Sequence, residues 1–171
     1  MTTARTIVEV SYNFKNDRSI ATTKEPFNSR ADSELAYAAG TGANKVSEIH
    51  SSRRILTSAS GTDDIDLQLL TDPSGVVINF QIIRWVYIKN REVSGGATMR
   101  IGGAGTNAWI APWKDSPTPT TVQATIEAGG EWFISSPIDG MRVITAERLL
   151  RIEHVGDSSG NLDYDFVMAG E

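Results

Sequence analysis

The sequence contains no cysteine, which excludes disulfide frameworks, thiolate zinc sites and cysteine nucleophiles. Long apolar runs are missing too. No segment approaches the roughly 18 apolar residues of a membrane-spanning helix, and the start, MTTARTIVEV, lacks the apolar core of a signal peptide. Positive charge is scarce, because 16 Lys and Arg stand against 21 Asp and Glu. We therefore expect a chain made in the cytosol, with no membrane segment and no nucleic-acid partner.

What is present suffices for one folded domain: 171 residues, 40% of them apolar, can bury a sizeable core. Near the start, Val8, Val10, Tyr12 and Phe14 alternate with polar residues, which predicts an early strand. The polar residues 15–35 lack periodicity and predict an extended arm or long loop. An Ala-rich piece within 35–45 is compatible with one helical turn. We place the N-terminal strand and arm at 1–35 and the folded domain at 36–171.

The folded domain reads as short strands separated by turns, which is typical of an all-β sandwich or barrel. In the segment 76–90, apolar residues stand at both odd and even positions near Ile82–Ile83, which predicts a bulge or a strand covered on both faces. TDPSG at 71–75 predicts a turn. The predicted strands are 54–58, 65–69, 76–90, 97–101, 107–110, 121–126, 131–135, 141–145, 148–154 and 161–168.

The stretch RIGGAGTNAW, residues 100–109, looks at first like a phosphate-binding loop. A Walker loop needs Lys followed by Ser or Thr after its last glycine, and a dinucleotide fingerprint needs a third glycine where Ala108 stands. We therefore predict no cofactor here. Gly102, Gly103 and Gly105 instead bend the connection after a strand, with Asn107 stabilising the turn and Trp109 opening the next strand.

Histidines and aspartates offer candidate chemistry that we judge to be structural. His50 lies beside Ser51 and Ser52, yet no local nucleophile motif is present, and His154 is far away in sequence. The clusters Asp63–Asp66 and Asp163–Asp165 occupy polar positions of alternating strands, so they fit a solvated face better than a calcium site. We predict neither catalytic residues nor a metal site.

Among the four tryptophans, Trp85 is expected in the core, while Trp109 and Trp113 flank Pro112 in a predicted loop. These two are the better candidates for exposed rings, either as a sugar-stacking platform or as interface anchors. The full set of interface candidates is Trp109, Trp113, Arg53, Arg54, Phe27 and Tyr12.

Residues 35–170 resemble small β-sandwich virion proteins of tailed bacteriophages in the order of their motifs. These are LAYAAGTGANK, then the FQIIRWVYIKN strand, then MRIGGAGTNAW, then IEAGGEWFISSPIDG and finally YDFVMAG. Gly102, Gly103, Ala104, Asn107 and Ala108 match the third motif, and a further group matches the fourth: Gly129, Gly130, Pro137 and Asp139. Ile138 stands inserted between the last two, and the first thirty-odd residues match nothing in this family.

The resemblance implies a single jelly-roll-like β-sandwich with an extended N-terminal arm. It also implies a structural virion protein, assembled in the host cytoplasm, with no catalytic residues. Our leading hypothesis is a capsid decoration or cement protein, a symmetric oligomer (a trimer in the simplest case) that binds the major capsid protein or other virion proteins. The alternative is a neck, tail-tip or glycan-binding receptor component. A glycan hydrolase is the third hypothesis, but no feature places two carboxylates such as Glu127 and Glu131 across a cleft.

Overall fold

The computed structural model describes residues 5–15, 28–57, 61–72, 74–93, 97–116, 118–155 and 161–171, with the backbone alone for 5–15 and 28–36. By its internal contacts the chain divides into two compact units, Met1–Ala39 and Gly40–Glu171. Strands dominate both units, and the described residues contain one short 3-10 helix.

The first unit contains a long β-hairpin. β1 (Arg5–Lys15) pairs antiparallel with β2 (Asn28–Ala39), from Arg5 opposite Ala38 to Lys15 opposite Asn28. The predicted early strand is confirmed, and residues 28–35 of the predicted arm are extended but belong to a strand. The predicted helical turn near residues 36–39 is wrong, because this piece pairs with β1 along its length, and hydrogen bonds between strands replace those within a helical turn.

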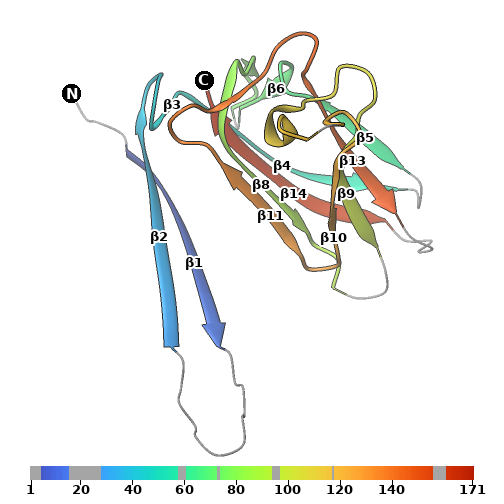
Figure 1. Cartoon of the computed structure of the whole chain (residues 1–171), viewed down its shortest axis with the longest axis horizontal. Helices are drawn as coiled ribbons and strands as arrows, with labels where there is room; N and C mark the ends of the chain where they lie inside the picture. Colours follow the sequence, from blue (N-terminus) through green and yellow to red (C-terminus); the bar gives the residue numbers. More distant parts are fainter. Residues whose placement is uncertain are drawn as a thin grey trace, which may run out of the picture. The chain divides into compact units, whose positions relative to one another are not determined.

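The second unit holds two antiparallel sheets (Figure 1). The five-stranded sheet has the order β11-β8-β14-β4, with β12 beside β8, and the four-stranded sheet has the order β10-β9-β13-β5. The strands of the five-stranded sheet are β4 (Glu48–Leu56), β8 (Ile82–Asn90), β11 (Glu131–Ser135), β12 (Met141–Arg142) and β14 (Leu162–Gly170). Those of the four-stranded sheet are β5 (Thr62–Asp66), β9 (Thr98–Gly102), β10 (Gln123–Ile126) and β13 (Leu149–Val155).

The order in which the chain visits these sheets defines a jelly-roll sandwich. It runs from β4 across to β5, back to β8, across to β9 and β10, back to β11 and β12, across to β13, and back to β14. The first and last long strands of the unit, β4 and β14, are therefore neighbours, as jelly-roll winding requires. The predicted all-β sandwich is confirmed.

Four short elements complete the unit: β3 (Lys45–Val46), β6 (Leu70–Thr71), β7 (Val77–Ile78) and the 3-10 helix η1 (Ala111–Trp113). β6 and β7 form a small hairpin around the predicted turn at 71–75. Asp72 stabilises that turn, because its carboxylate accepts a hydrogen bond from the Ser74 amide and its carbonyl accepts one from the Gly75 amide. Gly75 has φ +88°, a conformation that glycine adopts without strain, and the predicted turn is confirmed.

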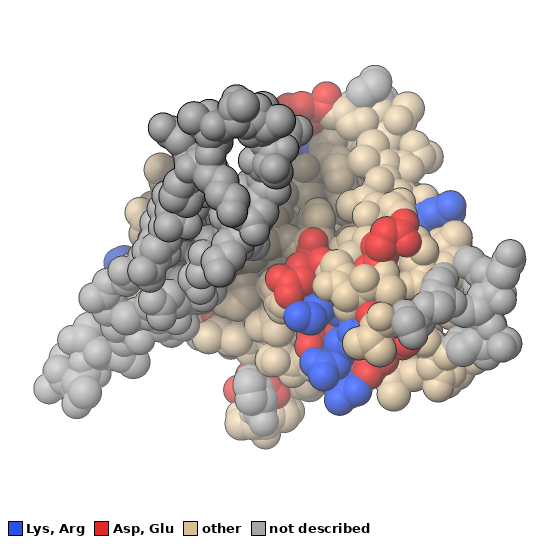
Figure 2. Space-filling view, turned by 90° about the horizontal axis from the view of Figure 1, so that it is seen from below, with Lys and Arg blue, Asp and Glu red and all other residues tan. Residues whose placement is uncertain are grey.

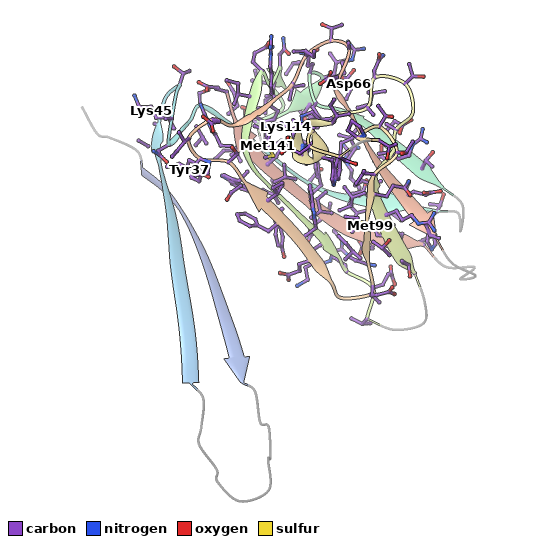
Figure 3. All side chains as sticks on the ribbon, viewed as in Figure 1. Tyr37, Lys45, Asp66, Met99, Lys114 and Met141 are labelled. Atoms are coloured by element: carbon purple, nitrogen blue, oxygen red, sulfur yellow. The ribbon has the colours of Figure 1, made fainter. Side chains whose placement is uncertain are left out.

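Apolar side chains from both sheets fill the space between them (Figure 3). On β14, Tyr164, Phe166 and Met168 are fully buried at alternate positions, and the intervening side chains face outward. Met99 on β9 and Met141 on β12, both labelled in Figure 3, are also buried. The alternation of inward and outward side chains along the strands therefore determines which residues form the core, as the sequence predicts.

β8 carries the predicted bulge. Ala169 pairs with Trp85 and the next residue, Gly170, pairs with Ile83, so Arg84 stands outside the ladder. The Arg84 side chain is 3% exposed; it donates to the Ile138 carbonyl at 2.8 Å and to Glu171 Oε1 at 2.5 Å. The bulge thus points a buried arginine at a carboxylate, and it explains why both parities are apolar near Ile82–Ile83.

Several strand predictions need correction. The strand predicted at 54–58 begins at Glu48 and ends at Leu56, and the strand predicted at 141–145 ends at Arg142. The segment 76–90 is interrupted at residues 79–81, and the predicted strand 65–69 ends at Asp66, with Leu69 left 69% exposed in a turn. Residues 107–110 form no strand. Ala108 makes a single bridge to Leu149, and η1 follows immediately, with Pro112 in its first turn. Proline lacks an amide hydrogen for the ladder and presets the helical φ, so a strand cannot continue through it.

Candidate interaction surface

The glycines of RIGGAGTNAW end β9 and turn the chain, as predicted. Gly102, Gly103 and Gly105 have φ values of +103°, +71° and +77°, and Asn107 has +55°. At Gly102 a Cβ atom would lie 2.5 Å from the Val122 carbonyl oxygen and 2.9 Å from the Trp113 ring. This glycine therefore serves the close packing of η1 on β9 as well as the turn.

The chain after these glycines is held by the segment before β13. The Asn107 carbonyl accepts hydrogen bonds from the Arg148 and Leu149 amides, each at 2.9 Å. Trp109 donates its amide to the Leu149 carbonyl at 2.8 Å and its indole Nε1 to the Arg142 carbonyl at 2.9 Å. Its ring is 1% exposed. The prediction that Trp109 is an exposed ring is wrong, because the turn carries it inward between the sheets.

Trp113, the other tryptophan predicted to be exposed, has Trp132 and not Trp109 as the neighbour of its ring. Its ring stacks on Trp132 of β11, with centroids 6.0 Å apart and planes 19° from parallel. Both rings are half-buried and pack against the core, as does Ala124 on the edge strand β10. The pair therefore covers the side of the sandwich where β10 and β11 are the edge strands. Sequence reasoning did not select Trp132, although its alternation with Glu131 on a short strand was a usable signal.

A network of polar side chains closes the opposite side, where β4 and β5 are the edge strands. Arg54 on β4 forms an ion pair with Asp63 on β5 at 2.8 Å, so this interaction bridges the two sheets. The hydroxyl of buried Tyr164 donates to the same Asp63 oxygen at 2.7 Å. Burial and the nearby Asp63 carboxylate both raise the pKa of Tyr164, which keeps its hydroxyl protonated as the donor.

His50 and Ser52 continue this network on β4. His50 is 4% exposed, and its Nδ1 donates to the Thr71 carbonyl at 2.6 Å. Its Nε2 lies 2.9 Å from Ser52 Oγ, and this hydroxyl oxygen accepts a hydrogen bond from Arg54 Nε at 3.2 Å. Burial lowers the pKa of His50, which favours the neutral ring with Nε2 as the acceptor. The histidine therefore ties the β6–β7 hairpin to β4.

The outer face of the five-stranded sheet carries two contrasting rows. One runs across four strands as Glu131, Lys89, Asp165 and Arg53, in the pairing order β11-β8-β14-β4. These charges are paired within the chain. Lys89 Nζ lies 2.8 Å from Glu131, Arg53 Nε donates to Asp163 at 2.8 Å, and Arg91 Nη1 lies 2.7 Å from Asp165. Hydrogen bonds from Lys89 and Arg53 lower the pKa values of Glu131 and Asp163 respectively.

The next row along the same face is apolar. It consists of Phe133, Tyr87 and Val167 on three neighbouring strands, all half-buried. Beyond it lie Trp85 and Ala169, which are buried although the pairing places them on the outer face. Residues 40–47 run along that end of the sheet, where the Asn44 amide donates to the Pro137 carbonyl and the Ser47 amide to the Gly170 carbonyl.

The outer face of the four-stranded sheet has a different character. Most of its ladder positions are polar, with Arg151 bonded to Asp64 at 2.7 Å and Arg100 3.8 Å from Glu153, while Leu149 and Val155 of β13 are apolar positions on the same face. Figure 2, which shows the molecule from below, likewise has blue and red atoms intermingled rather than in a field of one sign. The five-stranded sheet therefore differs in carrying a continuous apolar row beside a row of charges, a combination that also occurs at protein interfaces.

The predicted interface candidates thus fall in separate places. Arg53 lies on the outer face of the five-stranded sheet, with its side chain 59% exposed, and Arg54 lies in the network of the β4–β5 side. Trp109 is internal and Trp113 is packed on Trp132. Tyr12 lies within β1 opposite Ala31, with the backbone alone described, and Phe27 lies outside the described residues.

The aspartate clusters are engaged by arginines. Asp63, Asp64 and Asp66 pair with Arg54, Arg151 and Arg148 respectively. Across the part of the chain that the structure describes, no three His, Asp or Glu side chains gather closely enough to hold a metal ion. No helix in that part is long and apolar enough to cross a membrane.

Comparison with models of known protein families and with curated proteins finds no match for this chain.

Proposed function

We propose that this chain is a structural protein of a tailed-phage virion, and specifically a capsid decoration or cement protein. It would bind the coat lattice as a symmetric oligomer and join neighbouring coat subunits. The role is binding: many modest contacts, multiplied by symmetry, stabilise the shell. The jelly-roll sandwich agrees with the fold implied by the order of motifs in residues 35–170, and viral capsid domains are among the uses of this fold.

The observation that carries the proposal is the separate hairpin unit. β1 and β2 pair over eleven residues in a compact unit distinct from the sandwich. A two-stranded hairpin is marginally stable alone in water, and we propose that another subunit of the shell supplies a surface on which it packs. In a symmetric shell, neighbouring subunits offer such a surface. Along β1, Val8, Val10, Tyr12 and Phe14 occupy alternate positions, which is the pattern of a strand with one apolar face.

The copy number of the chain in purified virions tests this proposal. Mass spectrometry with isotope-labelled peptide standards would measure it relative to the major coat protein. A cement protein is expected at roughly hundreds of copies per particle, because it follows the symmetry of the shell. A few to about a dozen copies would instead indicate a neck or tail component. Absence from purified virions would refute the structural role altogether.

A receptor-binding role through a tryptophan platform receives less support. That platform requires two exposed rings, Trp109 and Trp113. Trp109 is 1% exposed and hydrogen-bonded to the Arg142 carbonyl, and Trp113 is engaged with Trp132. The geometry therefore favours the assembly role.

A further inference from the structure

The charged row on the five-stranded sheet has an internal symmetry. From β11 to β4 the signs alternate: Glu131 negative, Lys89 positive, Asp165 negative and Arg53 positive. All four belong to one line of paired residues across neighbouring strands, so their order along the line is fixed by the sheet register. Each has a partly exposed side chain, from 26% for Asp165 to 59% for Arg53.

An alternating row of four charges is complementary to its own reverse. Suppose that a second copy is turned by 180° about an axis that lies between the two faces and runs parallel to the strands. Its row then reads positive, negative, positive, negative against the first. Glu131 faces Arg53 of the second copy, and Lys89 faces its Asp165, and the same two pairs recur by symmetry. Such a two-fold contact is isologous and closed, so it cannot propagate into a fibre.

The rows on both sides of the charged row agree with the same rotation. Tyr87 on β8 and Val167 on β14 face each other across the axis, which places apolar surface beside the ion pairs. On the other side, Arg91 follows β8 and Asp163 lies on β14, and the Arg91 amide donates to the Asp163 carbonyl within the chain. Across the axis their side chains are again of opposite charge. The end near Trp85 is already buried, so the contact is confined to the charged half of the face.

We propose that this half of the five-stranded sheet is a two-fold self-association surface, whose partner is a second copy of the chain. The biological purpose of this contact rests on the proposed assembly role. Self-association is measured on the purified chain in solution, so a monomeric chain would refute the contact but not the virion role. Absence of the chain from purified virions would refute the virion role but not the contact.

The strength expected of this contact follows from its composition. Three rows of side chains make a small interface, and charged pairs in water add specificity more than affinity. The association is therefore expected to be concentration-dependent and weakened by salt. Sedimentation analysis of the full chain at low salt should show a monomer–dimer equilibrium that shifts towards monomer at high salt. A chain that stays monomeric up to about millimolar concentration at low salt would overturn the proposal, because its dimer Kd would then be weaker than about 1 mM.

Two single charge reversals test the register itself. Glu131→Lys places a lysine opposite Arg53 of the second copy, and Arg53→Glu places a glutamate opposite Glu131. By symmetry each variant gains two like-charge contacts, so each alone should dimerise at least about tenfold more weakly than the unaltered chain, a loss of about 1.4 kcal/mol. In an equimolar mixture, the lysine introduced by one substitution meets the glutamate introduced by the other, and the remaining pair is unaltered. The mixture should therefore form heterodimers with affinity near that of the unaltered chain.

Both substituted side chains are on the surface, and circular dichroism and thermal unfolding would verify that each variant is folded. Glu153→Lys, on the outer face of the four-stranded sheet, is the matched control and should leave dimerisation unchanged. The proposal fails if the mixture remains as weakly associated as the separate variants. It also fails if Glu153→Lys weakens association as much as Glu131→Lys, because the contact would then not be specific to the five-stranded sheet.

Discussion

At the scale of single residues, the tightest points of the fold are occupied by side chains with one specific property. Gly102 has no Cβ, and this allows the Trp113 ring and the Val122 carbonyl to reach the end of β9. Asp63 has two carboxylate oxygens, one of which accepts hydrogen bonds from both Arg54 and Tyr164. Neither residue belongs to a sequence motif with a known chemistry, yet both determine how the sandwich closes.

Replacing Gly102 by alanine should destabilise the protein by about 3 kcal/mol, from backbone strain at φ +103° together with the clash of the new Cβ. Gly105→Ala is the matched control. It has a similar positive φ of +77° but nothing within 4 Å of its added Cβ, so strain alone should cost about 1 kcal/mol. Urea denaturation of both variants measures the difference. Equal losses would mean that the packing of Trp113 on Gly102 contributes nothing.

His50 should make stability depend on pH. Its pKa in the folded protein is lowered by burial, below the ordinary value of 6.5 that it regains on unfolding. The unfolded chain then binds the proton more readily, so the free energy of unfolding is highest above pH 6.5 and falls as the pH drops through that value. His50→Gln should flatten the fall between about pH 7.5 and about 5.5. Parallel curves for the two proteins would show that His50 does not titrate as described.

At the scale of elements, the two sheets are joined differently on their two open sides. Between β10 and β11 the closure is aromatic, by Trp113 and Trp132. Between β4 and β5 it is polar, by the Arg54–Asp63 ion pair and the hydrogen bonds around it. On the polar side, hydrogen bonds link the edge strands of the two sheets. Because hydrogen bonds are directional, they restrict the relative position of these strands more than apolar packing does.

Substitutions at two neighbouring aspartates compare an ion pair that bridges the two sheets, made by Asp63, with an ordinary surface ion pair, made by Asp64. Asp63→Ala removes the acceptor of a fully buried tyrosine hydroxyl and should cost about 2 kcal/mol of unfolding free energy. Asp64→Ala removes an exposed pair with Arg151 on the outer face and should cost less than about 1 kcal/mol. Chemical denaturation compares them. Similar losses at the two positions would contradict a bridging role for Asp63.

Most of the elements were predictable because alternation survives in the sequence. Alternation of apolar and polar residues located β1, β5 and β14, and the doubly apolar stretch at Ile82–Ile83 indicated the bulge in β8. The failures occurred where non-local pairing decides the structure. The Ala-rich residues of β2 have no strong local preference for a strand, and they adopt one because β1 lies beside them.

The candidate surface was less predictable than the fold. Arg53 was selected from sequence, but the row to which it belongs brings together residues 53, 89, 131 and 165, and only the sheet register reveals it. Trp109 was misplaced because a tryptophan three residues before a proline, in a glycine-rich segment, resembles an exposed loop residue. Its burial depends on the Arg142 carbonyl, 33 residues away in sequence.

At the scale of the whole molecule, the chain combines a jelly-roll body with a hairpin unit, and one outer sheet face of the body carries an apolar row beside a row of charges. Contact with another subunit would bury the apolar row of the five-stranded sheet, and paired charges beside it would set the register of such a contact. The hairpin and the five-stranded face are therefore the parts that we expect to meet other subunits.

Cryo-electron microscopy of purified virions tests the assembly role most directly, because it identifies the neighbours of this chain in an intact particle. We expect density for the jelly-roll unit at repeated positions on the coat lattice, with the hairpin of each copy packed on an adjacent subunit. A particle whose lattice, neck and tail density is accounted for entirely by other chains would contradict that role.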